Sequence, residues 1–158
     1  FFFNPHPANR DSSTSRGLGD VYKRQNLRAP FFLSKELSNK LSASGGSIIN
    51  IIDIHADRPL KNHAVYNISK AGLKMMTLTL AKELAPSIRV NGVSPGSILW
   101  PEASAEISET EKKLMLEQIA LNRQGSPQDI ADTVLFLANS DYITGQIINI
   151  DGGRTLNQ

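Results

Sequence analysis

The sequence predicts an α/β protein with parallel strand pairing. Short runs of β-branched and apolar residues occur at about 47–52, 88–93 and 147–150, and longer segments with apolar residues at helical spacing separate them. Parallel neighbours in a sheet require a long crossover connection, which is usually a helix. Because strands alternate with helices of this length, we expect a layered domain in which helices cover a parallel sheet.

Local signals place the individual elements. A helix is expected at about 26–43, where two glycines follow, and a second at about 64–84, closed by Pro86. The run Ile48–Ile52 is apolar on both faces, as a central parallel strand should be. The remaining expectations are an irregular segment at about 98–108, helices at about 109–121 and 127–138, with Ser126-Pro127 and Asp129 at the start of the latter, and a last strand ended by Asp151-Gly152-Gly153.

Composition restricts the class of partner. The chain has 158 residues, 40% of them hydrophobic, which is enough for one domain with a core. Its formal net charge is only +2 and its basic residues are spread along the sequence. This pattern predicts neither a nucleic-acid partner nor a membrane partner. No apolar run approaches the roughly 20 residues of a membrane span, so a cytoplasmic protein is the default expectation.

Metal and disulfide chemistry is also disfavoured. The chain has no cysteine, which rules out disulfides and thiolate metal ligands. Its three histidines, His6, His55 and His63, do not form a set with metal-ligand spacing. We therefore expect no metal site, and we expect His55 to be a solvated loop residue near Asp53.

The first 25 residues differ in character from the rest. They carry Asn, Pro, Ser, Thr and Arg without helical or strand periodicity, and the run Asp11–Ser15 is typical of a loop or a disordered segment. We expect residues 1–25 to be a non-native or disordered leader, and residues 26–158 to form the folded domain. A native flexible arm is the open alternative.

The residues with the clearest chemical meaning are Tyr66 and Lys70. They stand four positions apart on a predicted helix, so their side chains share a face. An ammonium beside a phenol stabilises the phenolate, so we expect Lys70 to lower the pKa of Tyr66 from about 10 and to make it a proton donor at neutral pH. Asp53 lies 13 positions upstream of Tyr66, at the end of the predicted strand. Its alternative role is an Asx-turn at the strand end.

These residues resemble a known family. Tyr66-x-x-x-Lys70 is followed by Ala71-Gly72-Leu73 and by the segment Arg89–Gly96, in an order and spacing similar to the short-chain dehydrogenases/reductases. An aspartate at position 53, where most of that family carries serine, resembles the pteridine reductases. The resemblance covers Asn26 to about Leu156 and implies a partial Rossmann-like, doubly wound parallel sheet that lacks its N-terminal strands.

The resemblance also implies roles for single residues. Tyr66 would donate the proton and contact substrate, and Lys70 would tune Tyr66 and hold the nicotinamide ribose. Asn26 would hold a water in the proton path through its backbone, or would be an ordinary helix N-cap. Trp100 would stack on a flat substrate, or would only pack its loop onto the core. The cofactor carboxamide would lie against Pro95, Gly96, Ser97 and Ile98.

The implied function is NADPH-dependent reduction of a dihydropterin or dihydrofolate. Asp53 suits protonation of a C=N nitrogen better than stabilisation of a ketone-derived oxyanion. The first strands, the glycine-rich turn and the residues that choose between NAD and NADP are missing, so NADPH rests on the resemblance alone, and an open expectation is that the chain as given does not bind its cofactor and is inactive. Two alternatives stay open: another short-chain reductase, such as a 3-oxoacyl thioester reductase, and a non-catalytic fragment. The fragment would keep the helices at 26–43 and 64–84 through which the family forms homodimers and tetramers.

Overall fold

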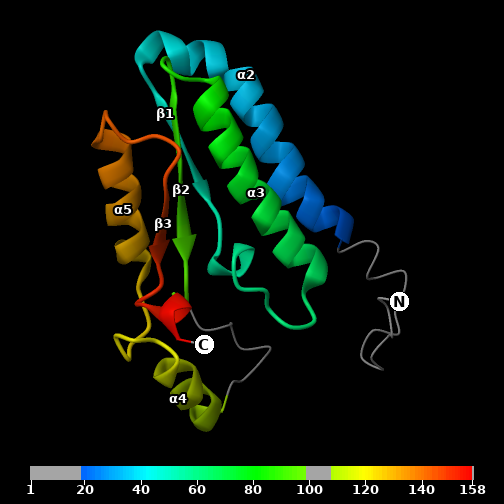
Figure 1. Ribbon diagram of the computed structural model, residues 1–158, viewed down its shortest axis with the longest axis vertical. Coiled ribbons are helices and arrows are strands. Elements are labelled where there is room, and N and C mark those ends of the chain that lie inside the picture. The colour runs from blue at the N-terminus through cyan, green and yellow to red at the C-terminus, as the bar shows by residue number, and fades with distance from the viewer. Residues whose placement is uncertain (1–18, 99–107, 158) are drawn as a thin grey trace.

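The structure is a computed structural model, and it describes residues 19–98 and 108–157. A helical stretch begins the described chain and runs through residues 19–23 into a π-helical turn, η2. Parallel strands and helices then alternate to the C-terminal turn, as Figure 1 shows. In chain order the elements are η2 (Arg24–Arg28), α2 (Ala29–Ser44), β1 (Ser47–Ile51), η3 (Ile54–Ala56), α3 (Ala64–Glu83), β2 (Arg89–Pro95), α4 (Glu109–Glu117), α5 (Pro127–Asn139), β3 (Ile147–Ile150) and η4 (Arg154–Leu156).

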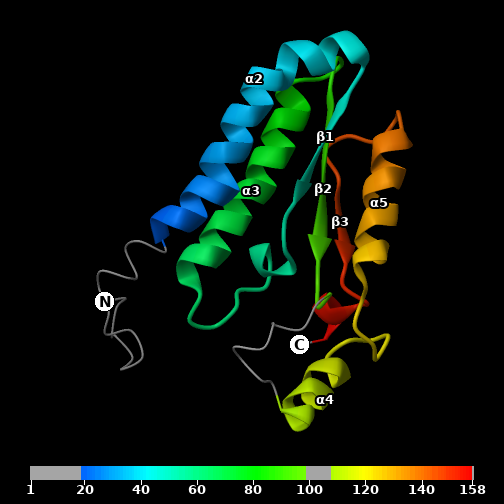
Figure 2. The same ribbon diagram turned by 180° about the vertical axis from the view of Figure 1, so that it is seen from behind.

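The described strands form one parallel sheet in the order β1-β2-β3. Val90 of β2 pairs with Ile48 of β1, and Val93 of β2 pairs with both Ile51 of β1 and Ile148 of β3. Helices α2 and α3 cover one face of the sheet and α5 covers the other, in both views of the ribbon (Figures 1 and 2). The expected α/β fold with parallel pairing is therefore present, as a partial Rossmann-like sheet.

Element boundaries agree with the expectations except at three places. The first helix continues upstream into residues 19–25, which were expected to be irregular, although the proposed domain boundary at residue 25 stays a prediction. The second strand runs on to Pro95, because the neighbouring β3 pairs with residues 92–95. Helix α4 ends at Glu117, several residues earlier than its apolar pattern suggested.

Strand β1 is less buried than expected. Within the described residues it pairs only with β2 and is an edge strand, so Ile51 is 48% exposed. Asn50 is the buried residue of β1, and its Nδ2 donates to Thr77 Oγ1 of α3 at 2.9 Å. This buried hydrogen bond fixes α3 against the sheet, since either group would cost free energy if it were left unpaired.

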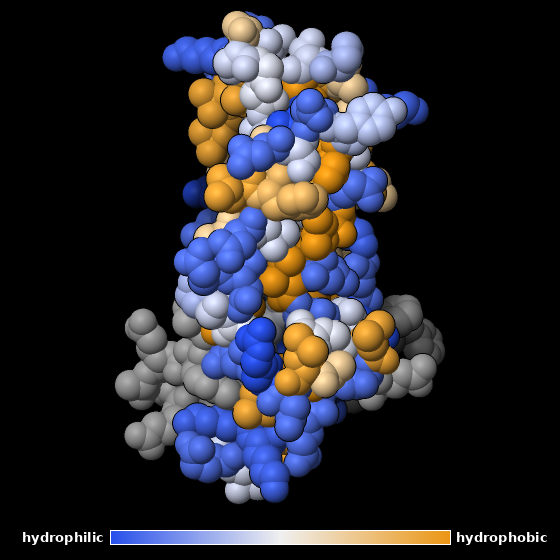
Figure 3. Space-filling model, turned by 90° about the vertical axis from the view of Figure 1, so that its left-hand side faces the viewer, coloured by the Kyte–Doolittle hydropathy of each residue, from blue (hydrophilic) through white to orange (hydrophobic). Residues whose placement is uncertain are grey.

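The main apolar core lies between α3 and the sheet. Leu80 and Ala81 of α3 pack with Ile88 and Val90 at the start of β2. Helix α5 also contacts the sheet, and its Leu137 is fully buried. Its outer side is different: Leu135 and Phe136 are exposed, and Figure 3 shows hydrophobic residues among hydrophilic ones over this side of the molecule.

Polar side chains connect β2 to the elements that follow it. Asn91 is completely buried, donates to Ile143 O at 2.8 Å and accepts from Gln146 N at 2.9 Å. Arg89 donates to the carbonyls of Leu137 and Ala138, each at 2.9 Å. These carbonyls end α5 and have no helical partner, so a cation there satisfies them. Arg89 and Asn91 of β2 thus hold α5 and β3 in place.

Helices α4 and α5 both begin with a capping box, and the start of α5 is the one that the sequence predicted. Ser126 and Asp129 form a reciprocal capping box at the start of α5, with Pro127 in the first turn. Ser108 and Glu111 form the same arrangement at α4. Within residues 19–98 and 108–157, no helix has the length and apolar character needed to span a membrane.

Candidate functional site

The candidate site lies at the carboxyl ends of the strands, where open α/β sheets bind ligands. Asp53 follows β1 and Tyr66 lies in the first turn of α3. The Tyr66 hydroxyl donates to Asp53 Oδ2 at 2.5 Å, and the backbone N–H of His55 donates to Asp53 Oδ1 at 2.8 Å. The carboxylate therefore makes the expected turn with one oxygen and binds the tyrosine with the other.

The electrostatics of Tyr66 differ from the expectation. Burial raises the pKa of Tyr66 well above its ordinary value, and the hydrogen bond and negative charge of Asp53 raise it further. The prediction that Lys70 lowers the pKa of Tyr66 is therefore wrong for this arrangement. The reason is geometric, because the carboxylate touches the phenol directly whereas Lys70 Nζ lies 5.9 Å from the centre of the Tyr66 ring.

Lys70 is held by the backbone of β1. Its Nζ donates to Ile51 O at 3.1 Å, at the end of the strand that leads to Asp53. Burial lowers the pKa of Lys70, and the negative charge of Asp53 opposes that shift. Asp53, Tyr66 and Lys70 are thus brought together as the sequence predicted, with the carboxylate in direct contact with the phenol.

Asn26 lies inside a helix, so its interpretation as a helix N-cap is wrong. It belongs to η2, where the N–H of Ala29 donates to Arg24 O, five residues back. Such π-helical turns inside longer helices often occur at functional sites. The Asn26 side chain donates to Ser69 Oγ at 2.9 Å, and Ser69 Oγ donates to Tyr66 O at 2.7 Å. This chain of hydrogen bonds connects Asn26 to the backbone of the tyrosine.

Gly72 explains how the helices approach each other so closely. A Cβ at this position would lie 2.8 Å from Leu27 Cδ2, beside Asn26. A larger residue would push η2 away from α3 and would strain the Asn26–Ser69 hydrogen bond. The glycine that follows the Tyr-x-x-x-Lys motif therefore has a packing role.

The segment after β2 runs beside the end of β3. Gly96 N donates to Ile150 O at 2.9 Å, and a Cβ on Gly96 would lie 2.7 Å from the backbone of Asp151. Ser97 O accepts from Gly125 N at 3.0 Å. Ser94 Oγ is buried at this end of the sheet without a hydrogen-bond partner among the described residues. Trp100 lies outside the described residues.

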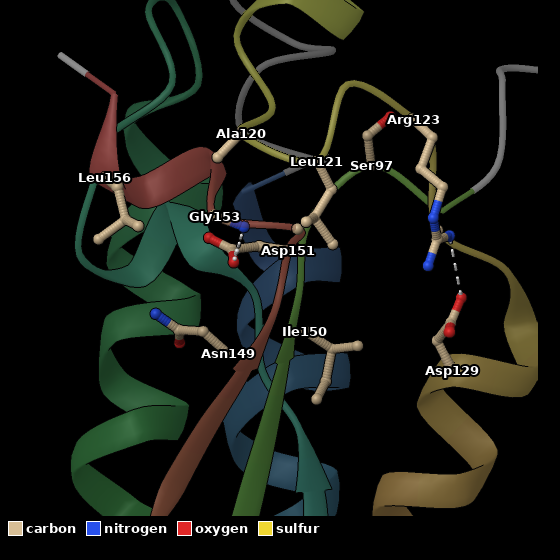
Figure 4. Close-up of a pocket in the computed structure, with 12 residues that line it drawn as sticks. Ser97, Ala120, Leu121, Arg123, Asp129, Asn149, Ile150, Asp151, Gly153 and Leu156 are labelled. Atoms are coloured by element: carbon tan, nitrogen blue, oxygen red, sulfur yellow. Dashed lines mark hydrogen bonds and ion pairs between the residues drawn. The ribbon is translucent and has the colours of Figure 1, made fainter.

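A cavity of about 450 Å³ opens beside the ends of β2 and β3. Figure 4 shows Ser97 and Asn149 on its walls, and Arg123 reaching toward Asp129, 3.9 Å away. Asp151 accepts hydrogen bonds from the backbone N–H groups of Gly153 and Thr155. Burial raises the pKa of Asp151, but these hydrogen bonds outweigh burial and leave the pKa below its ordinary value. Asp151 is thus a turn residue, as the sequence analysis assigned it.

Sequence reasoning missed three features of the site. Ser69 was not singled out, although it stands next to Lys70 in the motif. Tyr22 was set aside with the leader, yet its ring meets the Tyr66 ring edge-on at a centroid distance of 5.4 Å. The side chains around a second cavity, beside His55, were not recognised either. Among the described residues no group of three or more His, Asp or Glu side chains could hold a metal ion.

The described chain thus combines a parallel α/β sheet with a tyrosine, a lysine and a strand-end carboxylate at the carboxyl edge of that sheet. The family model described as Enoyl-(Acyl carrier protein) reductase matches residues 13–155. The chain belongs to the short-chain dehydrogenase/reductase family, of which it represents a C-terminal portion.

Similar proteins include reductases and dehydrogenases of known type. The chain is 43% identical to the 3-oxoacyl-[acyl-carrier-protein] reductase FabG of Thermotoga maritima over 149 residues, which is 92% of this chain and 57% of that protein. It is 39% identical to the 7alpha-hydroxysteroid dehydrogenase of Bacteroides fragilis over 83% of this chain and 52% of that protein. A solved apo SCOR enzyme from Clostridium thermocellum matches with a TM-score of 0.78 and 31% identity, over 89% of this chain and 54% of that one.

The chain therefore spans about half the length of the curated relatives that it matches. The family uses a nicotinamide cofactor, and the described residues include the part expected to contact its nicotinamide end. The glycine-rich turn for the pyrophosphate is not among the described residues.

The Asp53–Tyr66 contact makes a testable prediction about titration. In Asp53→Asn the phenol loses a charged acceptor and a repelling charge, so the pKa of Tyr66 should fall. It should stay above the ordinary value of about 10, because burial is the largest cause of the shift and is retained. NMR of tyrosine labelled at Cζ resolves Tyr66 from the other tyrosines. A Tyr66 pKa that stays the same or rises in Asp53→Asn would contradict the assignment.

Proposed function

We propose that the chain is part of an NADPH-dependent reductase that acts on the C=N bond of a dihydropterin or dihydrofolate. The observation that carries this proposal is the 2.5 Å hydrogen bond from the Tyr66 hydroxyl to Asp53 Oδ2. A carboxylate in direct contact with the proton donor favours some substrates and disfavours others. The choice depends on the charge that develops at the substrate during reduction.

Reduction of a ketone places growing negative charge on oxygen. A carboxylate next to the donor repels that charge, and neutral hydroxyl donors would serve better. The nitrogen of a C=N bond is more basic, so it can take up a proton before or while the neighbouring carbon is reduced. A carboxylate stabilises the resulting positive charge, and it can also accept hydrogen bonds from the N–H groups of a pterin ring.

The roles of this chain's residues follow from those contacts. The Tyr66 hydroxyl turns its hydrogen from Asp53 to the substrate nitrogen and passes the proton there as the hydride adds to the neighbouring carbon, which leaves a phenolate, while Asp53 orients the substrate. Lys70, fixed on Ile51 O, holds the ribose of the cofactor, and Asn26 acts through the backbone of its π-helical turn in returning a proton. When bound, the nicotinamide supplies a hydride to the substrate carbon. The net change is one hydride and one proton added across C=N.

The cofactor would contact Tyr66, Lys70 and residues 95–98 at its nicotinamide end. The preference for NADPH over NADH rests on the resemblance to pteridine reductases. Trp100 would lie over the substrate in the same resemblance. A homodimer or tetramer is proposed for the full-length protein.

Carbonyl reduction is the second candidate, and the names of the relatives favour it. The relatives include a 3-oxoacyl reductase, a hydroxysteroid dehydrogenase and an L-xylulose reductase. None of these three is named for a pterin. Under this candidate Asp53 is incidental to the chemistry, and Tyr66 protonates an oxygen.

A non-catalytic fragment is the third candidate, supported by exposed apolar side chains on two helices. On α2, Phe32 is 48% and Leu33 is 59% exposed, and on α3, Ile68 is 66% and Met75 is 62% exposed. Exposed apolar side chains in this number favour association with another surface. Such a chain would assemble without binding a cofactor.

A substrate panel separates the first two candidates. For the full-length protein, the pterin proposal predicts NADPH oxidation with dihydrobiopterin and little or none with acetoacetyl thioesters. Asp53→Ser should lower kcat/KM for dihydrobiopterin by about 10²-fold or more, because it removes the carboxylate from the donor. It should leave the thioester rate unchanged or raise it. Steady-state NADPH absorbance measures both.

Asp57→Asn is the matched control, because it removes a carboxylate four residues away that pairs with Lys74. It should leave the substrate preference unchanged. The pterin proposal would be contradicted, and the carbonyl candidate favoured, if the two substrates were reduced at equal rates and Asp53→Ser changed neither rate.

Cofactor binding tests the non-catalytic candidate. A ligand that binds only the folded chain raises its stability by about 2.7 kcal/mol at a concentration of 100 Kd. The enzyme proposal predicts that NADPH raises the thermal unfolding temperature. A chain that forms oligomers, and whose unfolding temperature does not change with NADPH or NADH, would support the non-catalytic candidate.

A further inference from the structure

A second cavity is lined by residues that follow Asp53 in the chain, and its lining includes none of Asp53, Tyr66 and Lys70. It has a volume of about 320 Å³ and lies between the loop after β1 and the C-terminal turn η4. Its wall begins with Ile54 and His55, directly after Asp53. Successive Cα atoms are about 3.8 Å apart, so the His55 Cα lies within roughly 8 Å of the Asp53 Cα. The backbone at Asp53 and the backbone of the cavity wall are therefore close together.

The charge of the cavity has one sign. Its lining contains Arg58, Lys61 and Arg154 and no acidic residue. Ion pairs in the described parts of the chain involve Lys74, Lys112 and Arg123, and none of them involves a cation of this cavity. Three basic residues on the wall of one cavity without a carboxylate favour an anionic ligand, because their mutual repulsion falls when an anion binds.

Hydrogen bonds hold the wall in place. Arg58 Nη1 donates to Asn157 O at 2.8 Å, and Asn157 Nδ2 donates to Gln118 O at 2.9 Å. These contacts join segments that are 99 and 39 residues apart in the sequence. The Arg58 guanidinium uses one N–H group to bind the carbonyl of Asn157, and its other N–H groups can donate to a ligand. A guanidinium fixed in this way binds carboxylate or phosphate with less loss of side-chain entropy than a free one.

The cavity also has an apolar part. Ile54, Pro59 and Leu60 contribute to the same wall as the cations. A ligand that matches it would carry an acidic group at the end of a partly apolar or aromatic chain. A simple inorganic anion would use only the cationic part.

We propose that this cavity is an anion-binding subsite that receives the acidic tail of an elongated substrate whose reacting ring lies at Asp53 and Tyr66. This inference rests on the proposed function for the identity of the ring. With a pterin ring, the ligand is the benzoylglutamate tail of dihydrofolate. The same charge chemistry would accept the phosphates of a coenzyme A thioester, so the test includes both sources.

Direct binding tests the subsite without catalysis. The probe is p-aminobenzoylglutamate, titrated by calorimetry into the full chain. Lys61→Gln and Arg154→Gln should each weaken its binding by about 3- to 10-fold, as expected for single charges at a partly exposed site. Added salt should weaken binding to the unaltered chain, because it screens these charges. Lys40→Gln, an exposed lysine at the far end of α2, is the matched control and should have no effect.

Steady-state kinetics place the subsite in the reaction. Each subsite variant should raise KM for dihydrofolate by the same factor while leaving kcat, and KM for dihydrobiopterin, unchanged, because dihydrobiopterin has no acidic tail. The second pair of substrates is acetoacetyl coenzyme A and its N-acetylcysteamine analogue, which lacks phosphates. A KM effect confined to acetoacetyl coenzyme A would assign the subsite to phosphate rather than to the glutamyl tail.

The outcomes separate this inference from the proposed function. Saturable, charge-dependent binding of p-aminobenzoylglutamate without turnover of either pterin would support the subsite and contradict the pterin reductase. Turnover of both pterins with no binding of the tail, or with equal binding to the variants and the unaltered chain, would overturn the subsite alone. If Arg154→Gln does not fold, Lys61→Gln, whose side chain is exposed, carries the same test.

Discussion

The hydrogen bond from Tyr66 to Asp53 is the interaction on which the account of this site depends. It puts a carboxylate in direct contact with the tyrosine hydroxyl, and this contact adds to the effect of burial in raising the pKa of Tyr66. Lys70 remains close, but its ammonium is committed to the backbone of β1. A proton donor with a raised pKa stays protonated at neutral pH and gives up its proton only to a basic acceptor.

The fold holds these two residues together through contacts that lie well away from them. Asn50 and Thr77 bind in the core and fix α3 against β1, which sets the distance from the strand end to the first turn of the helix. Gly72 allows η2 to pack against α3, and Asn26 then reaches Ser69 beneath the tyrosine. The position of the phenol is therefore determined by the packing of three elements.

Much of this arrangement could be predicted from sequence. The alternation of strands and helices was sufficient for the parallel sheet, and the spacing of Tyr66 and Lys70 placed both on one helical face. What could not be predicted was the direction of the Tyr66 pKa shift, because sequence spacing brings the lysine near but does not show that the carboxylate touches the hydroxyl. The subsite was missed for a related reason. Arg58 and Arg154 are far apart in the chain, and only the fold brings them to one cavity.

A double-mutant cycle on stability tests the central claim most directly. It compares Asp53→Ala, Tyr66→Phe and the double variant with the unaltered chain by urea unfolding. A hydrogen bond to a charged group at a partly buried site predicts a coupling free energy of about 1–2 kcal/mol between the two positions. Effects that add to within about 0.3 kcal/mol would show that the two side chains do not interact in solution, and would contradict the account.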